Sequence, residues 1–162
     1  MKIRKATPSD FERACEIYDS AREFMARNGN PNQWINNYPQ RNITMQDIED
    51  GILYVCERDN TVHAVFTLYY GEDATYGFIK DGQWLNNLPY AAVHRVASDM
   101  TVKGITKYMF DFCKTQYNNL KCDTHFDNIP MQRALEKNGF IKCGVIYTHN
   151  GTERVAYQFF QK

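Results

Sequence analysis

Two of the four histidines lie beside predicted strands, where they could exchange protons with a bound molecule. His94 lies within the nearly apolar segment Tyr90–Ala97, and His125 ends the segment Leu120–His125. Because imidazole titrates near neutral pH, either side chain could accept a proton directly or through water. Asp123 and Glu72 are further candidate bases. The alternative interpretation is that both histidines are hydrogen-bonded structural residues.

The segment after the first of these strands could bind a diphosphate. Four residues lie at the start of a helix that we expect to end near Tyr117: Lys103, Gly104, Ile105 and Thr106. Backbone N–H groups at a helix start point toward one spot and carry the positive end of the helix dipole, so they attract anions. Gly104 has no Cβ, which allows a ligand to approach the backbone closely. The alternative is that Gly104 only forms a turn.

Asn128 lies between a predicted strand and a helix predicted over Pro130–Asn138. At this junction its side-chain amide could donate to a polar ligand chain or cap the helix. Gly139 follows the helix, at a position where the chain often takes a positive φ. The junction is therefore a candidate second binding element.

The elements that position these residues mix hairpins with strand-helix-strand crossovers. The predicted strands are Met1–Ala6, Ile52–Arg58, Val62–Tyr70, Tyr90–Ala97, Leu120–His125, Ile141–His149 and Thr152–Phe160. The predicted helices run from Pro8 to about Met25, from Thr44 to Gly51, from about Lys103 to Tyr117 and from Pro130 to Asn138. The dipeptide Asn150-Gly151 predicts a type I′ turn in the last hairpin. This order predicts an α/β fold with a mixed sheet, in a single domain over residues 1–162.

Length and charge exclude several classes of protein. The 162 residues carry 19 basic and 19 acidic side chains, which argues against nucleic-acid binding and against attraction to an anionic membrane. Residues 1–99 carry ten basic and fourteen acidic side chains, and residues 100–162 carry nine and five, so we expect a bound anion in the later part. No apolar run is long enough to span a membrane, and the amino terminus lacks the apolar stretch of a signal peptide. We therefore expect a cytoplasmic protein.

The five cysteines are widely scattered and form no C-x-x-C pair, which argues against disulfides and against a metal site. We expect them to be small buried hydrophobic residues. A thiol-dependent enzyme that uses Cys122 or Cys143 is a weaker alternative, because neither adjoins a suitable set of His and Asn residues.

The stretch from Asp123 to Phe140 resembles the second half of the acyl-CoA site in the GNAT N-acetyltransferase superfamily. The matching residues are Asn128, Met131, Glu136, Lys137, Gly139 and Phe140. The segment from His94 to Phe110 resembles the pyrophosphate-binding motif of the family, with Val102 in place of the first glycine. The resemblance covers nearly the whole chain. It implies a GNAT-like acyl-CoA N-acyltransferase fold, with a mixed central sheet of about seven strands and about four flanking helices.

The resemblance also implies a reaction: direct transfer of an acetyl group from acetyl-CoA, the co-substrate, to a primary amine. The residues expected to bind acetyl-CoA are Val96, Ala97, Ser98, Val102, Lys103, Gly104, Ile105, Thr106, Asn128 and Met131. The backbone N–H of Val96 is expected to stabilise negative charge on the thioester carbonyl. A base must take the proton of the amine, and His94 and His125 are the candidates for it.

Many relatives protonate the departing thiolate with a tyrosine seven residues after the asparagine, a position that Leu135 occupies here. Tyr147, Tyr108 and Tyr90 are alternative donors, although each could equally be a packing residue among eleven tyrosines. The missing tyrosine favours a second hypothesis, a non-catalytic acyl-CoA-binding or interaction module with the same fold.

In this family the acceptor is bound by the loop between the first two helices and by the long connection before the central strand. The aromatic residues there are Phe24, Trp34, Tyr38, Tyr76 and Trp84, and the acids are Glu72 and Asp73. Aromatic and acidic side chains together suit an amine cation. We therefore expect a small-molecule or peptide amine as acceptor, with Trp34, Tyr38 and Tyr76 as substrate-binding residues. The alternative is that these side chains cover a groove or form a homodimer contact.

Overall fold

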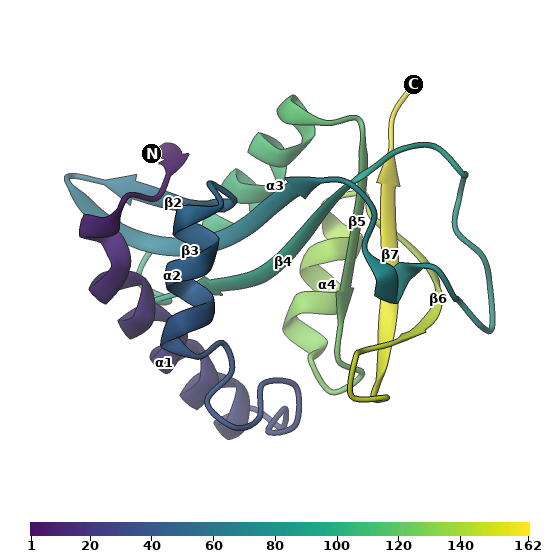
Figure 1. Ribbon diagram of the computed structural model, residues 1–162, viewed down its shortest axis with the longest axis horizontal. Helices are drawn as coiled ribbons and strands as arrows, with labels where there is room; N and C mark the ends of the chain where they lie inside the picture. Colours follow the sequence, from purple (N-terminus) through teal and green to yellow (C-terminus); the bar gives the residue numbers. More distant parts are fainter.

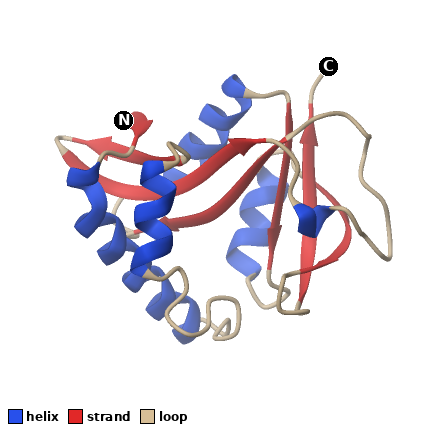
Figure 2. Ribbon diagram, in the orientation of Figure 1, coloured by secondary structure: helices blue, strands red, loops and turns tan.

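The computed structural model describes residues 1–162 and contains one seven-stranded mixed sheet. The strand order is β1-β2-β3-β4-β5-β7-β6, with helices on both faces (Figure 1, Figure 2). The strands are β1 (Lys2–Lys5), β2 (Leu53–Arg58), β3 (Thr61–Tyr70), β4 (Ala91–Ser98), β5 (Asn119–Thr124), β6 (Ile141–Tyr147) and β7 (Glu153–Phe160). The helices are α1 (Phe11–Arg27), α2 (Arg41–Glu49), α3 (Ile105–Gln116) and α4 (Ile129–Lys137), with short 3-10 helices η1 (Pro8–Asp10) and η2 (Ala74–Tyr76). The predicted α/β class and element order are confirmed.

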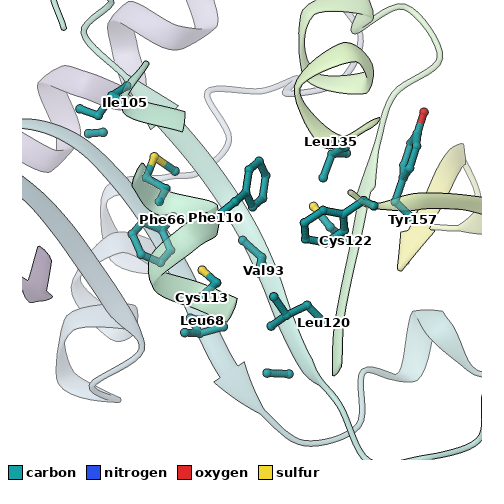
Figure 3. Close-up of a cluster of buried hydrophobic side chains, with 14 of the residues drawn as sticks. Phe66, Leu68, Val93, Ile105, Phe110, Cys113, Leu120, Cys122, Leu135 and Tyr157 are labelled. Carbon is teal, nitrogen blue, oxygen red and sulfur yellow. The ribbon is translucent and has the colours of Figure 1, made fainter. Parts of the chain in front are cut away.

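Two apolar layers fix the helices to the sheet. On one face, α3 and α4 pack on the sheet through residues such as Phe110, Leu135 and Val93 (Figure 3). On the other face, α1 and α2 cover the β2–β3 part of the sheet. The connection between β3 and β4 covers the remaining part of that face, where Tyr76 and Tyr90 pack against Ala156. On this second face, therefore, the helices cover one part of the sheet and the β3–β4 connection covers the other.

The sheet opens between its two central parallel strands. β4 and β5 pair only at Ala91 with Leu120 and at Ala92 with Lys121, and they diverge beyond these residues (Figure 1). A β-bulge in β4 contributes to this split: the register with β3 shifts between Val65 and Thr67. The backbone of a bulged strand bends away from its neighbour. The diverging strands leave a gap in which a ligand can reach the centre of the sheet.

The bulge centres on Arg95, which has a φ of 49°. A positive φ is uncommon for a residue with a side chain and needs support from its surroundings. The hydroxyl of Tyr18 donates to the Arg95 carbonyl at 3.0 Å, and the hydroxyl of Thr67 donates to the His94 carbonyl at the same distance. The guanidinium group binds the Asp47 carboxylate through two hydrogen bonds. These contacts from three elements hold the bulge in place.

Two local predictions are wrong. Helix α2 begins at Arg41 rather than at Thr44, and Thr44 is a buried residue inside the helix. A type I′ turn needs positive φ at both central residues. In the last hairpin only Gly151 has one, whereas Asp59 and Asn60 in the first hairpin have φ values of 52° and 61°.

All five cysteines are free and buried, which confirms their interpretation as buried hydrophobic residues. Burial raises the pKa of Cys122 well above its ordinary value, and burial raises the pKa of Cys143 as well. A thiol with a raised pKa is a poor nucleophile near neutral pH. The structure therefore disfavours a thiol-dependent enzyme. None of the helices is long and apolar enough to cross a membrane.

Candidate active site

A cavity of about 640 Å³ lies where β4 and β5 diverge. Its walls come from the two strands, from the loop between α1 and α2, from the start of the β3–β4 connection, from α4 and from the β6–β7 hairpin. Nine of the residues singled out from the sequence line it: Trp34, Tyr38, Glu72, Asp73, His94, Val96, Asp123, Asn128 and Met131. The cavity is large enough for a small organic molecule.

His94 lies in this cavity between two carboxylates that come from distant parts of the chain. Its Nε2 is 2.8 Å from Asp73 Oδ2, and its Nδ1 is 3.7 Å from Asp123 Oδ2. All three side chains are mostly buried. The 2.8 Å contact is a hydrogen bond, which places the proton of a neutral His94 on Nε2 and leaves Nδ1 as an acceptor. The second carboxylate is too distant for a hydrogen bond, so Nδ1 remains open to a ligand or water.

Asp73 is held ionised by the groups around it. Burial alone would raise the pKa of Asp73, but hydrogen bonds from His94 and Thr75 outweigh burial and lower the pKa below its ordinary value. The hydroxyl of Tyr69 also donates to Asp73 Oδ2, at 3.0 Å. The Tyr90 hydroxyl accepts a hydrogen bond from the Asp73 backbone N–H at 2.8 Å. An ionised Asp73 can orient His94 and stabilise its protonated form.

Asp123 has a different partner, Tyr76, whose hydroxyl donates to Asp123 Oδ2 at 2.8 Å. Burial and the negative charge of Asp123 raise the pKa of Tyr76 well above its ordinary value, so Tyr76 stays protonated. The Tyr76 ring also packs against the His94 ring, with 5.6 Å between centroids. Tyr76, which we predicted to bind substrate, is buried and does not line the cavity. It instead contacts Asp123 and His94.

Arg95 and Tyr38 form a wall of the cavity. The Arg95 guanidinium binds Asp47 with contacts of 2.8 and 2.9 Å, and it donates to the Tyr38 hydroxyl at 3.0 Å. Arg95 therefore has a buried acidic partner in Asp47. Trp34 packs edge-on against both Tyr18 and Tyr38. The loop between α1 and α2 is thus fixed against β4 by aromatic contacts and an ion pair.

Asn128 caps α4, because its Oδ1 accepts from the Met131 N–H at 3.2 Å. Its Nδ2 donates to Gln33 Oε1 at 2.9 Å, and the side chain of Asn30 donates to the same oxygen at 2.9 Å. The Thr124 hydroxyl approaches this oxygen at 3.3 Å. Gln33 therefore ties the loop between α1 and α2 to the junction of β5 and α4.

The start of α3 carries a row of free N–H groups. The first intrahelical bond is from Tyr108 N–H to the Gly104 carbonyl, and none of the six N–H groups from Val102 to Lys107 donates to another group of the chain. Gly104 has a φ of 74°, and a Cβ built there would meet nothing within 4 Å. These free N–H groups and the open space beside Gly104 suit an anion, and binding of one here stays a prediction.

The remaining candidates lie outside the cavity. His125 Nδ1 accepts from the Asp127 N–H at 3.0 Å, and burial lowers the pKa of His125. Tyr147 stacks on Phe78, faces Lys80 and does not line the cavity, because its strand turns this side chain toward the outer surface. Leu135 is fully buried in the core under α4 and cannot supply a proton. Ala97 is buried against the layer under α1 and α2, so only its backbone could contact a ligand.

Comparison with solved structures identifies the fold. A GNAT-family acetyltransferase from Streptococcus agalactiae is similar over 99% of this chain and 95% of that chain, with 28% sequence identity and a TM-score of 0.91. The chain has the GNAT acetyltransferase fold. A GNAT-family acetyltransferase from Listeria monocytogenes shares this fold at 18% identity, with a TM-score of 0.71 and coverage of 97% of this chain and 92% of that chain. No protein-family model and no curated protein sequence matches the chain.

The GNAT fold also occurs in AAC(6')-Ib, whose structure was solved in complex with Parmomycin and AcetylCoA. That enzyme is 15% identical to the chain, with a TM-score of 0.67 and coverage of 99% of this chain and 93% of that chain. The resemblance read from the sequence motifs is therefore confirmed. The similarity to the Streptococcus agalactiae acetyltransferase supports acetyl transfer as the general class of reaction.

Sequence reasoning named His94 but missed two of the groups that surround the cavity. Gln33 and Arg154 line it, and neither belongs to a recognisable motif. Asp123 was named as a candidate base and Asp73 as an acid near the expected amine site, but their approach to one imidazole depends on the fold of the β3–β4 connection. No group of three His, Cys, Asp or Glu side chains is placed to hold a metal ion.

Proposed function

We propose that the protein transfers an acetyl group from acetyl-CoA to a primary amine, with His94 as the base. The observation that carries this proposal is the position of His94, between Asp73 and Asp123, in a cavity at the split between β4 and β5. Acetyl-CoA, when bound, supplies the acetyl group as an activated thioester. The residues of this chain would then bind it, attract the amine and accept a proton.

The chain offers two elements that fit the co-substrate. The free N–H groups from Val102 to Lys107, with open space beside Gly104, suit the diphosphate. The divergence of β4 from β5 leaves room for an extended ligand beside Val96 and Met131, which both line the cavity. We assign the Val96 N–H to the thioester oxygen, because a fixed backbone donor stabilises developing negative charge in a dry site.

His94 is placed to deprotonate the amine of the acceptor. An alkylamine has a pKa near ~10, so it enters as a cation, and the carboxylates of Asp73 and Asp123 favour that cation. Nδ1 of His94 faces this position and can take the proton directly or through one water. Asp73 then stabilises the protonated imidazole through Nε2. The neutral amine attacks the thioester carbonyl, a C–N bond forms, the C–S bond breaks and CoA departs as a thiolate. The nitrogen releases its second proton to water as the amide forms.

No tyrosine is assigned as the donor to this thiolate. Tyr147 and Tyr90 do not line the cavity, and Tyr108 is exposed on α3. A thiolate is a stable leaving group because the pKa of an ordinary thiol is near ~8.5, so it can leave without a proton. The reaction can therefore proceed without the tyrosine whose position Leu135 occupies.

The proposal is tested in two steps. Acetyl-CoA should raise the melting temperature of the protein by binding the folded state. Incubation with acetyl-CoA and a panel of primary amines should then release free CoA thiol, and mass spectrometry should detect an amide that is about 42 Da heavier than the amine, the acetyl increment expected of N-acetylation. Binding without turnover on a wide panel would favour the non-catalytic acyl-CoA-binding module. No binding at millimolar acetyl-CoA would overturn both functions.

A further inference from the structure

Arg154 is the buried arginine of the chain that has no acidic partner. It lies on β7, is 7% exposed and lines the cavity. Six other arginines each have a carboxylate within 4.0 Å, and the last two, Arg27 and Arg133, are exposed. Burying an unpaired charge is costly, so a charged side chain in such a place calls for an explanation.

The contacts of Arg154 within the protein are incomplete. Nη1 donates to the Glu153 carbonyl at 3.0 Å and Nη2 donates to the Gln33 carbonyl at 3.1 Å. A guanidinium has five N–H donors, so three remain without a partner in the chain. Burial lowers the pKa of Arg154, and the nearby charge of Asp123 opposes this effect. The guanidinium nevertheless stays charged at neutral pH, because arginine is not deprotonated in proteins.

Arg154 shares a face of the sheet with the proposed catalytic groups. Asp123 pairs with Ala156 across β5 and β7, and Arg154 is two residues from Ala156, so both side chains project to the same side. Asp123 in turn lies beside His94. One wall of the cavity thus has negative carboxylates beside the base, and a positive guanidinium lies on the adjoining strand.

We propose that Arg154 binds a carboxylate of the acceptor, so that the acceptor is an amino acid or a related amine that carries a carboxylate. This inference rests on the proposed function and names its substrate class. A carboxylate matches the planar fork of a guanidinium and can accept two of its free N–H donors. The ammonium group of the same molecule would lie beside Asp123 and Nδ1 of His94. Opposite charges at the two positions select a molecule that carries both charges.

The position on the strands limits the separation of the two groups. Diagonal neighbours on adjacent antiparallel strands are about 7–8 Å apart at their backbones, and both side chains extend toward the cavity. This spacing suits an amine and a carboxylate within the same small molecule. It also places the anion in the carboxyl-terminal, more basic part of the chain.

The test compares each of the twenty common L-amino acids with its carboxamide, in which the amine is kept and the negative charge is lost. The first readout is the affinity for each compound, measured by calorimetry in the presence of CoA. The second is the rate at which each compound is acetylated by acetyl-CoA. We expect at least one amino acid to be preferred over its carboxamide by about 10- to 100-fold, the value of a hydrogen-bonded charged group. Arg154→Gln should abolish this preference, and Arg154→Lys should retain only part of it because it lacks the fork.

Controls separate this inference from the proposed function. Arg27→Gln removes an exposed arginine without an ion pair and should leave the preference unchanged. The affinity for acetyl-CoA should be the same in the wild type and in Arg154→Gln. The inference is overturned if carboxamides bind as well as free acids, if no amino acid binds, or if Arg154→Gln keeps the preference. Acetylation of amines without a carboxylate, with no preference for acids, would support the proposed function and overturn this inference alone.

Discussion

Asp73 and Asp123 lie beside the two nitrogens of one imidazole: Nε2 of His94 is 2.8 Å from the first carboxylate, and Nδ1 is 3.7 Å from the second. The unequal distances give the two acids different tasks. Asp73 is close enough to fix the tautomer and orientation of the ring. Asp123 leaves a gap in which an amine or a water molecule can contact both its carboxylate and Nδ1. The geometry therefore combines a positioned base with a site for a cation.

His94→Gln tests the base. Glutamine keeps a polar side chain of similar reach but cannot accept a proton at neutral pH, so we expect kcat to fall by about 10²- to 10⁴-fold. The affinity for acetyl-CoA, measured by calorimetry, should stay within a factor of about two, because His94 contacts neither the α3 start nor Asn128. His63→Gln is a matched control, since His63 also lies 2.9 Å from a partly buried aspartate, Asp99. Equal losses in both variants would show that the effect of His94 is structural.

Gly104→Asp tests whether the start of α3 binds the diphosphate of acetyl-CoA. A carboxylate at this position would face the free N–H groups from Val102 to Lys107, so it should compete with the diphosphate and weaken acetyl-CoA binding by more than about tenfold. Asparagine tolerates positive φ better than most residues and has the same shape. Gly104→Asn is therefore the control for strain, and it should bind acetyl-CoA more tightly than Gly104→Asp.

A second pair of variants excludes a general effect of charge. Gly29 also has a positive φ, 84°, and open space where a Cβ would lie, but it follows α1. Gly29→Asp and Gly29→Asn should bind acetyl-CoA equally. If Gly104→Asp and Gly104→Asn also bind equally, the diphosphate does not lie at the start of α3.

Asp73→Asn tests the contribution of the ionised carboxylate to folding. The pKa of Asp73 is lower in the folded state than in the unfolded state, so its stabilising effect is complete above its ordinary pKa near ~4 and is lost as the pH falls below that value. The melting temperature of the wild type should therefore exceed that of Asp73→Asn at pH 7, and the difference should shrink toward pH 3. Asp59→Asn, at an exposed turn, should follow the wild-type curve. If the difference in melting temperature between the wild type and Asp73→Asn stays constant from pH 7 to pH 3, the ionised carboxylate is not its source.

Much of the fold was predictable because the local signals agreed with the final structure. The segment Thr7-Pro8-Ser9-Asp10 marks the first helix, where Asp10 accepts from the Thr7 N–H and binds Arg4. Apolar alternation indicated the first strand, and runs of β-branched, aromatic or other apolar residues between turn signals indicated the later ones. The motif around Asn128 indicated the junction of β5 and α4. These features depend on residues that are close in sequence.

The site was less predictable because it depends on contacts between distant residues. The bulge at Arg95 requires a positive φ in a residue that has no intrinsic preference for it, and support comes from Tyr18, Thr67 and Asp47. Such tertiary support leaves no local pattern. Arg154 carries no motif either, since its unusual feature is the absence of an acid in the folded protein. Local periodicity reports which face a residue occupies, but not which charged groups converge there.

Leu135→Tyr tests whether the chain can accept the tyrosine that many relatives have at this position. Leu135 is fully buried between α4 and the sheet, so a larger polar side chain should overpack the core and lower the free energy of unfolding by about 1–3 kcal/mol. We expect no gain in kcat, because the side chain faces the core. Leu135→Met conserves volume and should cost less than about 1.5 kcal/mol in urea denaturation. A more active Leu135→Tyr enzyme would show that this side chain can reach the thiolate.

Gln33→Leu tests the tie between the α1–α2 loop and the β5–α4 junction. Leucine removes the oxygen that accepts from Asn30 and Asn128 at 2.9 Å, and it leaves these buried or half-buried donors without a partner. Such a loss should lower stability by about 1–3 kcal/mol. Gln33→Glu keeps an acceptor oxygen at the same reach, and no group of the chain accepts from Gln33 Nε2, so it should stay near the wild type. Urea unfolding of both variants measures the difference, and an equal loss in both would show that the loop is held by packing of Trp34 rather than by this hydrogen-bonded oxygen.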